Sequence, residues 1–174
     1  MSETSETGHV YGCVFCVTGK EVNAARLIEW ACEGIRVTVA RQLMQKTVHG
    51  ITHAEEKALY PGYAFFEAPA GKDIVRKFPK DKSILSVLKS ETGDWRLYGN
   101  DAKHAQWLFS YDGLIPVSKA CKEGEWVRII SGPLLSLQGQ ILHFDKHHRS
   151  AQVAISFCNR VIKTWFQYEL IEPV

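Results

Sequence analysis

The distribution of apolar residues changes at Gly113, and no other feature of the 174-residue sequence constrains the fold as strongly. Before Gly113, segments with strand-like alternation are interleaved with segments whose apolar residues recur at helical spacing. From Gly124 onward the sequence contains only short β-type segments separated by turn residues. The pattern predicts an α+β domain over residues 9–113, with helices packed on a mixed β-sheet. A small five-stranded β-barrel is predicted over residues 123–174.

Local signals mark the ends of the helices predicted in the first domain. Thr18 and Glu21 have the spacing of a capping box, and Asn100 is a good N-cap for a later helix. Gly34 and Gly113 are natural helix stops. The predicted elements are a strand at 10–17, a helix at 21–34, a long hairpin at 37–60 with a polar tip, a strand at 63–68, a short basic helix at 71–80, a strand at 83–90 and a helix at 100–113.

Two segments are predicted to lie outside both domains. Residues 1–8 are polar and acidic and lack the basic and apolar regions of a signal peptide, so we expect a disordered tail. Residues 114–122 contain a proline and two lysines without periodicity, which predicts a flexible linker.

The composition is that of an ordinary globular protein, with 45% hydrophobic and 23% charged residues. A formal net charge of +2 gives no general attraction to nucleic acid, so any such affinity must come from local clusters. The five cysteines are odd in number and lack the spacing of a disulfide framework, which indicates a reducing compartment such as the cytoplasm. No apolar run is long enough to cross a bilayer, so we expect no membrane association.

The sequence YPGYAFFEA combines a sharp Pro-Gly bend with a strand that is apolar on both faces. Because strand side chains alternate, Tyr63 and Phe65 point to one face of that strand. Tyr11, Cys13 and Phe15 likewise share one face of the first strand. If the two strands are neighbours, these residues form one aromatic patch. The patch is either a binding surface or ordinary core beneath a helix.

No group of residues predicts catalysis, a metal site or a cofactor. Cys13 and Cys16 are three positions apart on a strand and therefore point to opposite faces, and no second CxxC pair completes four metal ligands. The sequence has no glycine-rich phosphate loop, GxSxG elbow or HExxH motif. We therefore predict that the protein is not an enzyme. Surface or turn positions are expected for His49, His53, His143, His147 and His148.

Two clusters of basic residues are candidate RNA-binding sites, since exposed basic side chains supply contacts to phosphates. One lies in the predicted basic helix and the other in a turn of the barrel. Solvated helix faces and turns are often charged as well, so the purely structural alternative stays open. Trp126, Trp165 and Phe166 are expected in the barrel core, with platforms for base stacking as the alternative. The candidate RNA contacts are Lys72, Arg76, Lys77 and Lys80, accompanied by Lys82, and Lys146, His147, His148 and Arg149.

The two halves together resemble the NusG family of transcription elongation factors. The resemblance is carried by YPGYAFFEA in the first half and by GEWVRIISGPLLSLQGQILHFDKHHRSAQVAISF in the second. In the second half Gly132, Pro133 and Gly139 stand at a fixed offset between strands, and a later strand ends in Asp before a basic turn. The stretch KHHRSAQVAISF is more similar to the specialised LoaP-type paralogs than to the general factor. The first strand has Tyr11 and Gly12 where the family commonly has Trp-Tyr.

The resemblance covers residues 9–173 and implies an N-terminal NGN domain followed by a C-terminal KOW domain, an SH3-like five-stranded barrel. In NusG-like proteins, the positions that match the aromatic patch bind the coiled-coil clamp helices of the largest RNA polymerase subunit. The resemblance therefore implies polymerase contacts for Tyr11, Cys13, Phe15, Tyr63 and Phe65. LoaP-type factors are thought to bind an RNA hairpin in the nascent leader, which favours RNA contacts at the basic turn.

The expected function is that of a processive transcription antitermination or elongation factor. Its expected partners are the polymerase clamp helices, a nascent RNA hairpin and DNA of the transcription bubble, and we expect a monomer in the bacterial cytoplasm without a cofactor. The alternative is a KOW-containing RNA-binding or ribosome-associated module that makes no polymerase contact.

Overall fold

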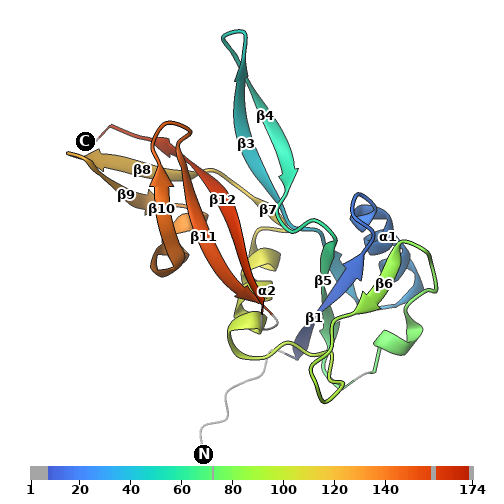
Figure 1. Ribbon diagram of the computed structural model, residues 1–174. Helices are drawn as coiled ribbons and strands as arrows, with labels where there is room; N and C mark the ends of the chain where they lie inside the picture. The colour runs from blue at the N-terminus through green and yellow to red at the C-terminus, as the bar shows by residue number, and fades with distance from the viewer. Residues whose placement is uncertain (1–7, 72, 158–159, 173–174) are drawn as a thin grey trace, which may run out of the picture. The chain divides into compact units, whose positions relative to one another are not determined.

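The computed structural model describes residues 8–71, 73–157 and 160–172 (Figure 1). Most of the predicted tail, residues 1–7, lies outside the described residues. Backbone contacts divide the chain into unit 1, which contains residues up to Ala40 and Tyr60–Gly113, and unit 2, which contains Arg41–Leu59 and the residues from Leu114 onward. The predicted boundary at residue 113 therefore coincides with a boundary between units, whereas the long hairpin groups with the C-terminal part of the chain.

Unit 1 is built on a four-stranded sheet in the order β2-β5-β1-β6, in which neighbouring strands are antiparallel. Helix α1 packs beside β2 and β5, and α2 packs on β1 (Figure 1). This arrangement of helices on a sheet agrees with the predicted α+β class. The elements are β1 (His9–Cys16), α1 (Glu21–Ala31), β2 (Arg36–Thr38), β5 (Tyr63–Pro69), the 3₁₀ turn η1 (Val75–Lys77), β6 (Ile84–Val87) and α2 (Gly99–Ser110).

One core of unit 1 lies between the sheet and α1. Its centre is Phe66, which is fully buried and packs its ring against those of Phe78 and Trp95. A Cβ atom at Gly12 would lie 2.2 Å from the tip of the Phe66 ring, so this position has no room for a side chain. The first strand therefore requires glycine at the second position of its Tyr-Gly pair. The remaining core residues are Val14, Cys16, Ala24, Ile28, Cys32, Ile35, Ala64, Ala68 and Ile74.

The predicted bend at YPGY is confirmed, and Glu21 connects it to the start of α1. The amide of Tyr63 donates to the carbonyl of Tyr60 at 3.1 Å, and Gly62 has φ +86°. One carboxylate oxygen of Glu21 accepts from the amides of Gly19 at 3.1 Å and Gly62 at 2.8 Å. Burial opposes the charge of Glu21, but these hydrogen bonds outweigh it and lower the pKa of the carboxyl.

Three predictions for unit 1 are wrong in detail. Thr18 does not cap α1, because the N-cap residue is Lys20 and no side chain bonds there. Asn100 lies inside α2, whose N-cap is Tyr98. The predicted basic helix over 71–80 is only the turn η1, since Phe78 is already extended, as a residue before proline tends to be.

Unit 2 contains a three-stranded sheet in the order β4-β3-β7 and a five-stranded sheet in the order β10-β11-β12-β8-β9. The five strands confirm the predicted β-type C-terminal domain. The turn between β3 and β4 is formed by His49 and Gly50, both with positive φ, which suits a tight hairpin. The strands are β3 (Arg41–Val48), β4 (Ile51–Ala58), β7 (Leu114–Ile115), β8 (Ser118–Glu123), β9 (Trp126–Ser131), β10 (Ile141–Asp145), β11 (Ser150–Phe157) and β12 (Arg160–Leu170), with α3 (Pro133–Ser136) and η2 (Gln138–Gln140) after β9.

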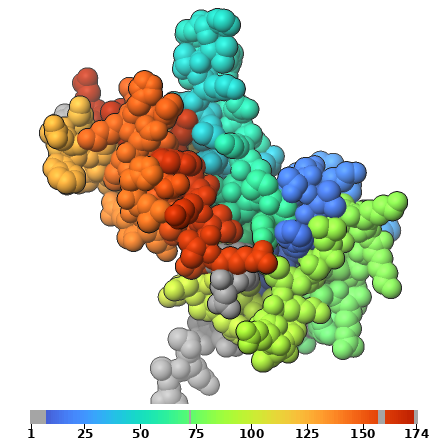
Figure 2. Space-filling model, viewed as in Figure 1, coloured from blue at the N-terminus to red at the C-terminus, as the bar shows by residue number. Residues whose placement is uncertain are grey.

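The hairpin of β3 and β4 is polar along most of its length. Every residue of β4 is exposed, and Figure 2 shows the cyan hairpin as a narrow projection. The predicted hairpin is confirmed by the antiparallel pairing of β3 and β4, but the predicted long tip is wrong, because the turn has only two residues and the next residues belong to β4.

The prediction of a flexible linker at 114–122 is wrong. This segment forms β7 and most of β8, and β8 pairs with β9 on one side and with β12 on the other. A strand in that position lies inside its sheet, so Ser118, Ala120 and Cys121 are buried.

The core of unit 2 confirms one of three predicted aromatic residues. Phe166 is buried, and Trp165 is partly buried with its ring 4.8 Å from that of His143. Trp126 is 80% exposed, so its assignment to the core is wrong. Trp126 is the first residue of β9, and strand alternation does not enforce burial at a strand end. Among the described residues, no helix has both the length and the apolar character needed to span a membrane.

Candidate functional site

The predicted aromatic patch lies on one face of the sheet in unit 1. In the register of β1 and β5, Cys13 is opposite Phe65, Phe15 is opposite Tyr63, and Tyr11 is opposite the carboxylate residue Glu67. Directly opposite residues of an antiparallel pair share a face. The structure thus brings the predicted residues together on neighbouring strands.

Helix α2 covers much of this face, so the alternative of core beneath a helix holds for part of the patch. Phe65 is 1% exposed, and its ring lies 5.9 Å from that of Tyr60 and 6.4 Å from that of His104. Cys13 is fully buried. The ring of Tyr11 lies 5.7 Å from that of Phe109 in α2. Phe65 and Cys13 are therefore core residues in the free protein.

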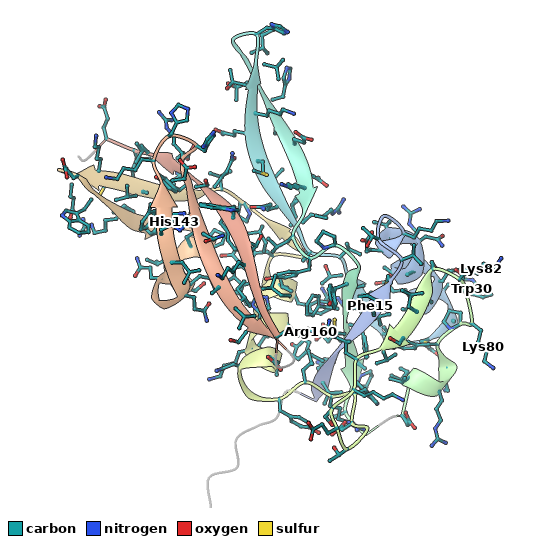
Figure 3. The ribbon with its side chains drawn as sticks, viewed as in Figure 1. Phe15, Trp30, Lys80, Lys82, His143 and Arg160 are labelled. Carbon is teal, nitrogen blue, oxygen red and sulfur yellow. The ribbon has the colours of Figure 1, made fainter. Side chains whose placement is uncertain are left out.

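Phe15 and Tyr63 remain partly accessible and form what we call the aromatic edge. Their rings meet edge to face at a centroid distance of 5.3 Å. Phe15 is labelled on β1 in Figure 3. Tyr11 is also partly exposed, but it leans on α2. The accessible part of the predicted patch is thus smaller than the sequence suggested.

A polar pair of buried Tyr60 and partly buried His104 holds α2 to the strand-bearing part of unit 1. The hydroxyl of Tyr60 and Nε2 of His104 are 2.8 Å apart. Burial lowers the pKa of His104 to about 4 and raises the pKa of Tyr60. His104 is therefore neutral near pH 7, and its ring stacks on Trp107 at 5.4 Å. This arrangement fixes the helix that covers Phe65.

The cysteines of unit 1 are buried and separated. Cys16 belongs to the core beneath α1, whereas Cys13 faces α2 with Phe65, as their spacing on the strand predicts. Burial, with a smaller contribution from the Glu21 charge, raises the pKa of Cys16 to about 11. Burial also raises the pKa of Cys32, whose thiol contacts the carbonyl of Lys77 at 3.5 Å. Within the described ranges, no three His, Cys, Asp or Glu side chains are grouped to hold a metal.

The basic cluster of unit 1 follows one side of α1. Lys72 lies outside the described residues, and Arg76 pairs with Asp73 at 2.9 Å. The segment from Lys77 to Ser83 is held at both ends. The thiol of Cys32 contacts the carbonyl of Lys77, and the side chains of Asn23 and Ser83 are 3.4 Å apart.

Trp30 lies on the same side of unit 1 as this cluster. Figure 3 shows its side chain together with those of Lys80 and Lys82. Trp30 is 87% exposed, and the sequence analysis missed it. The sequence feature that indicates this exposure is the position of Trp30 outside the apolar stripe of α1.

The basic turn of unit 2 connects β10 to β11. Asp145 accepts from the amide of His148 at 3.0 Å and contacts Nδ1 of its ring at 2.7 Å. Both hydrogen bonds lower the pKa of Asp145, and the bond from the backbone amide has the larger effect. Lys146 donates to the main-chain carbonyl of Glu125. Arg149 has φ +48° and an exposed side chain.

A hollow lies beside this turn. It has a volume of about 330 Å³ and is lined by Glu125, Trp126, Val127, Phe144 and Lys146. No local sequence signal connects Trp126 with the basic turn, because Trp126 begins β9 and the turn lies between β10 and β11. The hollow places an exposed aromatic residue and a lysine in one site.

Comparisons with known proteins agree with the resemblance seen in the sequence. No family model matches the chain. The sequence is 25% identical over 136 residues to the transcription termination/antitermination protein NusG of Borreliella burgdorferi, with 72% of this chain and 73% of that protein covered. The structure matches one from a study of domain interaction in Thermotoga maritima NusG, with a TM-score of 0.51 and 17% identity over 91% of this chain and 93% of that one, which shows a shared fold. On these grounds the chain is similar in sequence to a NusG transcription termination/antitermination protein and shares the fold of a NusG protein.

Proposed function

We propose that this protein is a processive antitermination factor of the LoaP type, which joins elongating RNA polymerase through unit 1 and allows transcription of a target operon to pass terminators. The observation that carries the polymerase contact is the partly exposed, edge-to-face pair of Phe15 and Tyr63. A rigid aromatic pair with accessible ring edges is a typical anchor for an amphipathic coiled coil. The clamp helices of the largest polymerase subunit have that form.

The five predicted polymerase residues divide into two roles in this proposal. Phe15 and Tyr63 contact the clamp helices directly, and Tyr11 borders them. Cys13 and Phe65 are buried in the free protein, so they hold β1 and β5 in place beneath the contact surface. A clamp-helix contact that reached Phe65 would require α2 to move.

The proposed RNA contacts differ in how much of their charge is available. Arg76 is paired with Asp73, and His148 is held by Asp145. No ion pair involves the other described cations of the two clusters, which leaves them available to phosphates. The proposed set is Lys146, His147, His148 and Arg149 in unit 2 and Arg76, Lys77 and Lys80 with Lys72 in unit 1. A leader RNA hairpin is the main proposed ligand, and DNA of the transcription bubble is a second.

Such a factor acts as a monomer where transcription takes place, in the bacterial cytoplasm. It needs no cofactor and no catalytic residue, because its effect comes from binding to the polymerase.

Capture by isolated clamp helices tests the polymerase contact. The full chain is expected to bind, and Tyr63→Ala is expected to weaken binding by about 2 kcal/mol or more. Tyr98→Ala is a control, since Tyr98 is a 65% exposed tyrosine of unit 1 that does not belong to the aromatic edge. If the clamp helices do not bind while RNA does, the chain is the alternative KOW-type RNA-binding or ribosome-associated module.

A transcription assay tests the function itself. The template carries a terminator, with or without an upstream leader that encodes a hairpin. The protein is expected to raise read-through more strongly when the leader is present. Equal read-through on both templates would contradict the antitermination role and indicate a general elongation factor.

A further inference from the structure

Among the described residues of unit 2, Trp126 is the most exposed large apolar side chain, at 80%. It follows the two-residue turn between β8 and β9, where it pairs with Glu123. Isolated exposed apolar residues are normal and need no explanation. Trp126 differs because it borders a hollow.

The hollow beside Trp126 has an apolar wall. Its volume of about 330 Å³ is at the small end of ligand sites, and Val127 and Phe144 line it together with Trp126. Phe144 is fixed from behind by Tyr168, at a ring distance of 5.9 Å. A hollow of this volume with an apolar wall suits a single flat ring.

The rim of the hollow carries positive charge. Lys146 lines it and donates to the main-chain carbonyl of Glu125, a neutral group that leaves the lysine charge uncancelled. Arg149, in the same turn, forms no ion pair with any residue that the structure describes. Of the nearby acids, Glu123 is paired with Arg128 at 2.9 Å and Asp145 with His148. Among the described residues that line the hollow, Glu125 is the one whose carboxylate opposes an anion.

From this combination we propose that the hollow is a stacking site for a single unpaired RNA base, with Trp126 as the stacking partner and Lys146 and Arg149 contacting the flanking phosphates. Stacking on an aromatic side chain beside basic groups is how proteins bind single-stranded nucleic acid. A base inside a stem cannot present its face in this way, so the ligand is a loop or bulge nucleotide. This inference rests on the proposed RNA contact at the basic turn and specifies which part of the hairpin binds.

Three RNA probes test the proposal on the full-length protein. They are a short hairpin with an unpaired loop, the same stem as a blunt duplex, and an unstructured oligonucleotide. Trp126→Ala is expected to lower affinity for the hairpin and the oligonucleotide about fivefold or more, and to leave duplex binding unchanged. Trp126→Phe keeps an aromatic face and should retain most of the affinity. Ile130→Ala, a 37% exposed position of the same strand outside the hollow, is the control and should bind as the wild type does.

The outcomes separate this inference from the proposed function. If Trp126→Ala binds the hairpin normally while Arg149→Glu does not, the stacking site is wrong and the RNA contact at the turn stands. An equal loss on the blunt duplex also overturns stacking. If the wild type binds none of the probes, both RNA proposals fail, whereas capture by the clamp helices still decides the polymerase contact. If Trp126→Ala instead abolishes binding of a protein partner and leaves RNA binding intact, the hollow is a protein-binding site and the proposal is refuted.

Discussion

Replacing Phe65 or Tyr63 by alanine should have opposite consequences, although the two residues are neighbours on β5. Phe65 is 1% exposed and packs on Tyr60 and His104, so removal of its ring leaves a cavity beneath α2. Such changes lower the free energy of unfolding by about 3–5 kcal/mol. Tyr63 is partly exposed and loses mainly its edge-to-face contact with Phe15, which is worth about 1 kcal/mol.

Chemical denaturation and clamp-helix binding, measured on the same preparations, provide the assay. Phe65→Ala should shift the unfolding midpoint of unit 1 strongly. Tyr63→Ala should leave it within about 1 kcal/mol of the wild type and still weaken binding to the clamp helices by about 2 kcal/mol or more. Binding should be measured without denaturant and at a temperature where both variants remain folded. Unfolding is then not mistaken for weaker affinity.

Two results would refute the reasoning. If Phe65→Ala keeps the stability of the wild type, α2 does not pack on this face in solution. If Tyr63→Ala binds the clamp helices as tightly as the control Tyr98→Ala does, the aromatic edge is not the docking surface.

Three further predictions concern charge, backbone strain and pH. Lys146→Glu and Arg149→Glu should each weaken hairpin binding and flatten the plot of log affinity against log salt by about 0.7 to 0.9, and unchanged slopes would move the RNA site elsewhere. Gly132→Ala should destabilise unit 2 by about 1–3 kcal/mol, because Gly132 has φ +94° and its added Cβ would lie 2.8 Å from a neighbouring backbone atom. Gly139→Ala, where nothing lies within 4 Å, should change stability by less than about 0.5 kcal/mol, and equal losses would contradict this account. The pKa of His104 is lowered from 6.5 to about 4, so between these pH values the unfolded chain binds a proton that the folded chain does not. The contribution of His104 to the free energy of unfolding should be fully present above pH 6.5. It should fall by up to about 3 kcal/mol between pH 6.5 and 4. His104→Gln should flatten this part of the denaturation profile, and an unchanged profile would assign the pH dependence to other groups.

The sequence was sufficient where one local rule decides the structure. Alternating and helical periodicities identified the first strand, the two longer helices and the β-type C-terminal region. The Pro-Gly pair fixed the bend before Tyr63, where Gly62 has φ +86°. The same-face arrangement of Cys13 and Phe65 follows from strand alternation once β1 and β5 are neighbours.

The sequence was insufficient where burial depends on distant elements. Residues 114–122 lack large apolar side chains at regular spacing, so nothing local revealed that β8 would be enclosed between two strands. The apolar residues on both faces of β5 correctly indicated that both need a cover, but they could not show that α2 supplies the second one. The exposure of Trp126 and Trp30 was missed because a large aromatic residue is usually assigned to the core, and only the tertiary structure shows that these two find no place in it.

The buried cysteines allow local opening of each unit to be followed by a chemical reaction. Thiol alkylation requires an accessible thiolate, and Cys13, Cys16 and Cys32 in unit 1 and Cys121 in unit 2 are all buried. Each should react only when its surroundings open, so the rate of alkylation at each position reports the free energy of local opening. Peptide mass spectrometry after brief alkylation would therefore record the opening of unit 1 and of unit 2 separately in one sample. Addition of polymerase or RNA would then show, without any introduced label, which unit each partner holds closed.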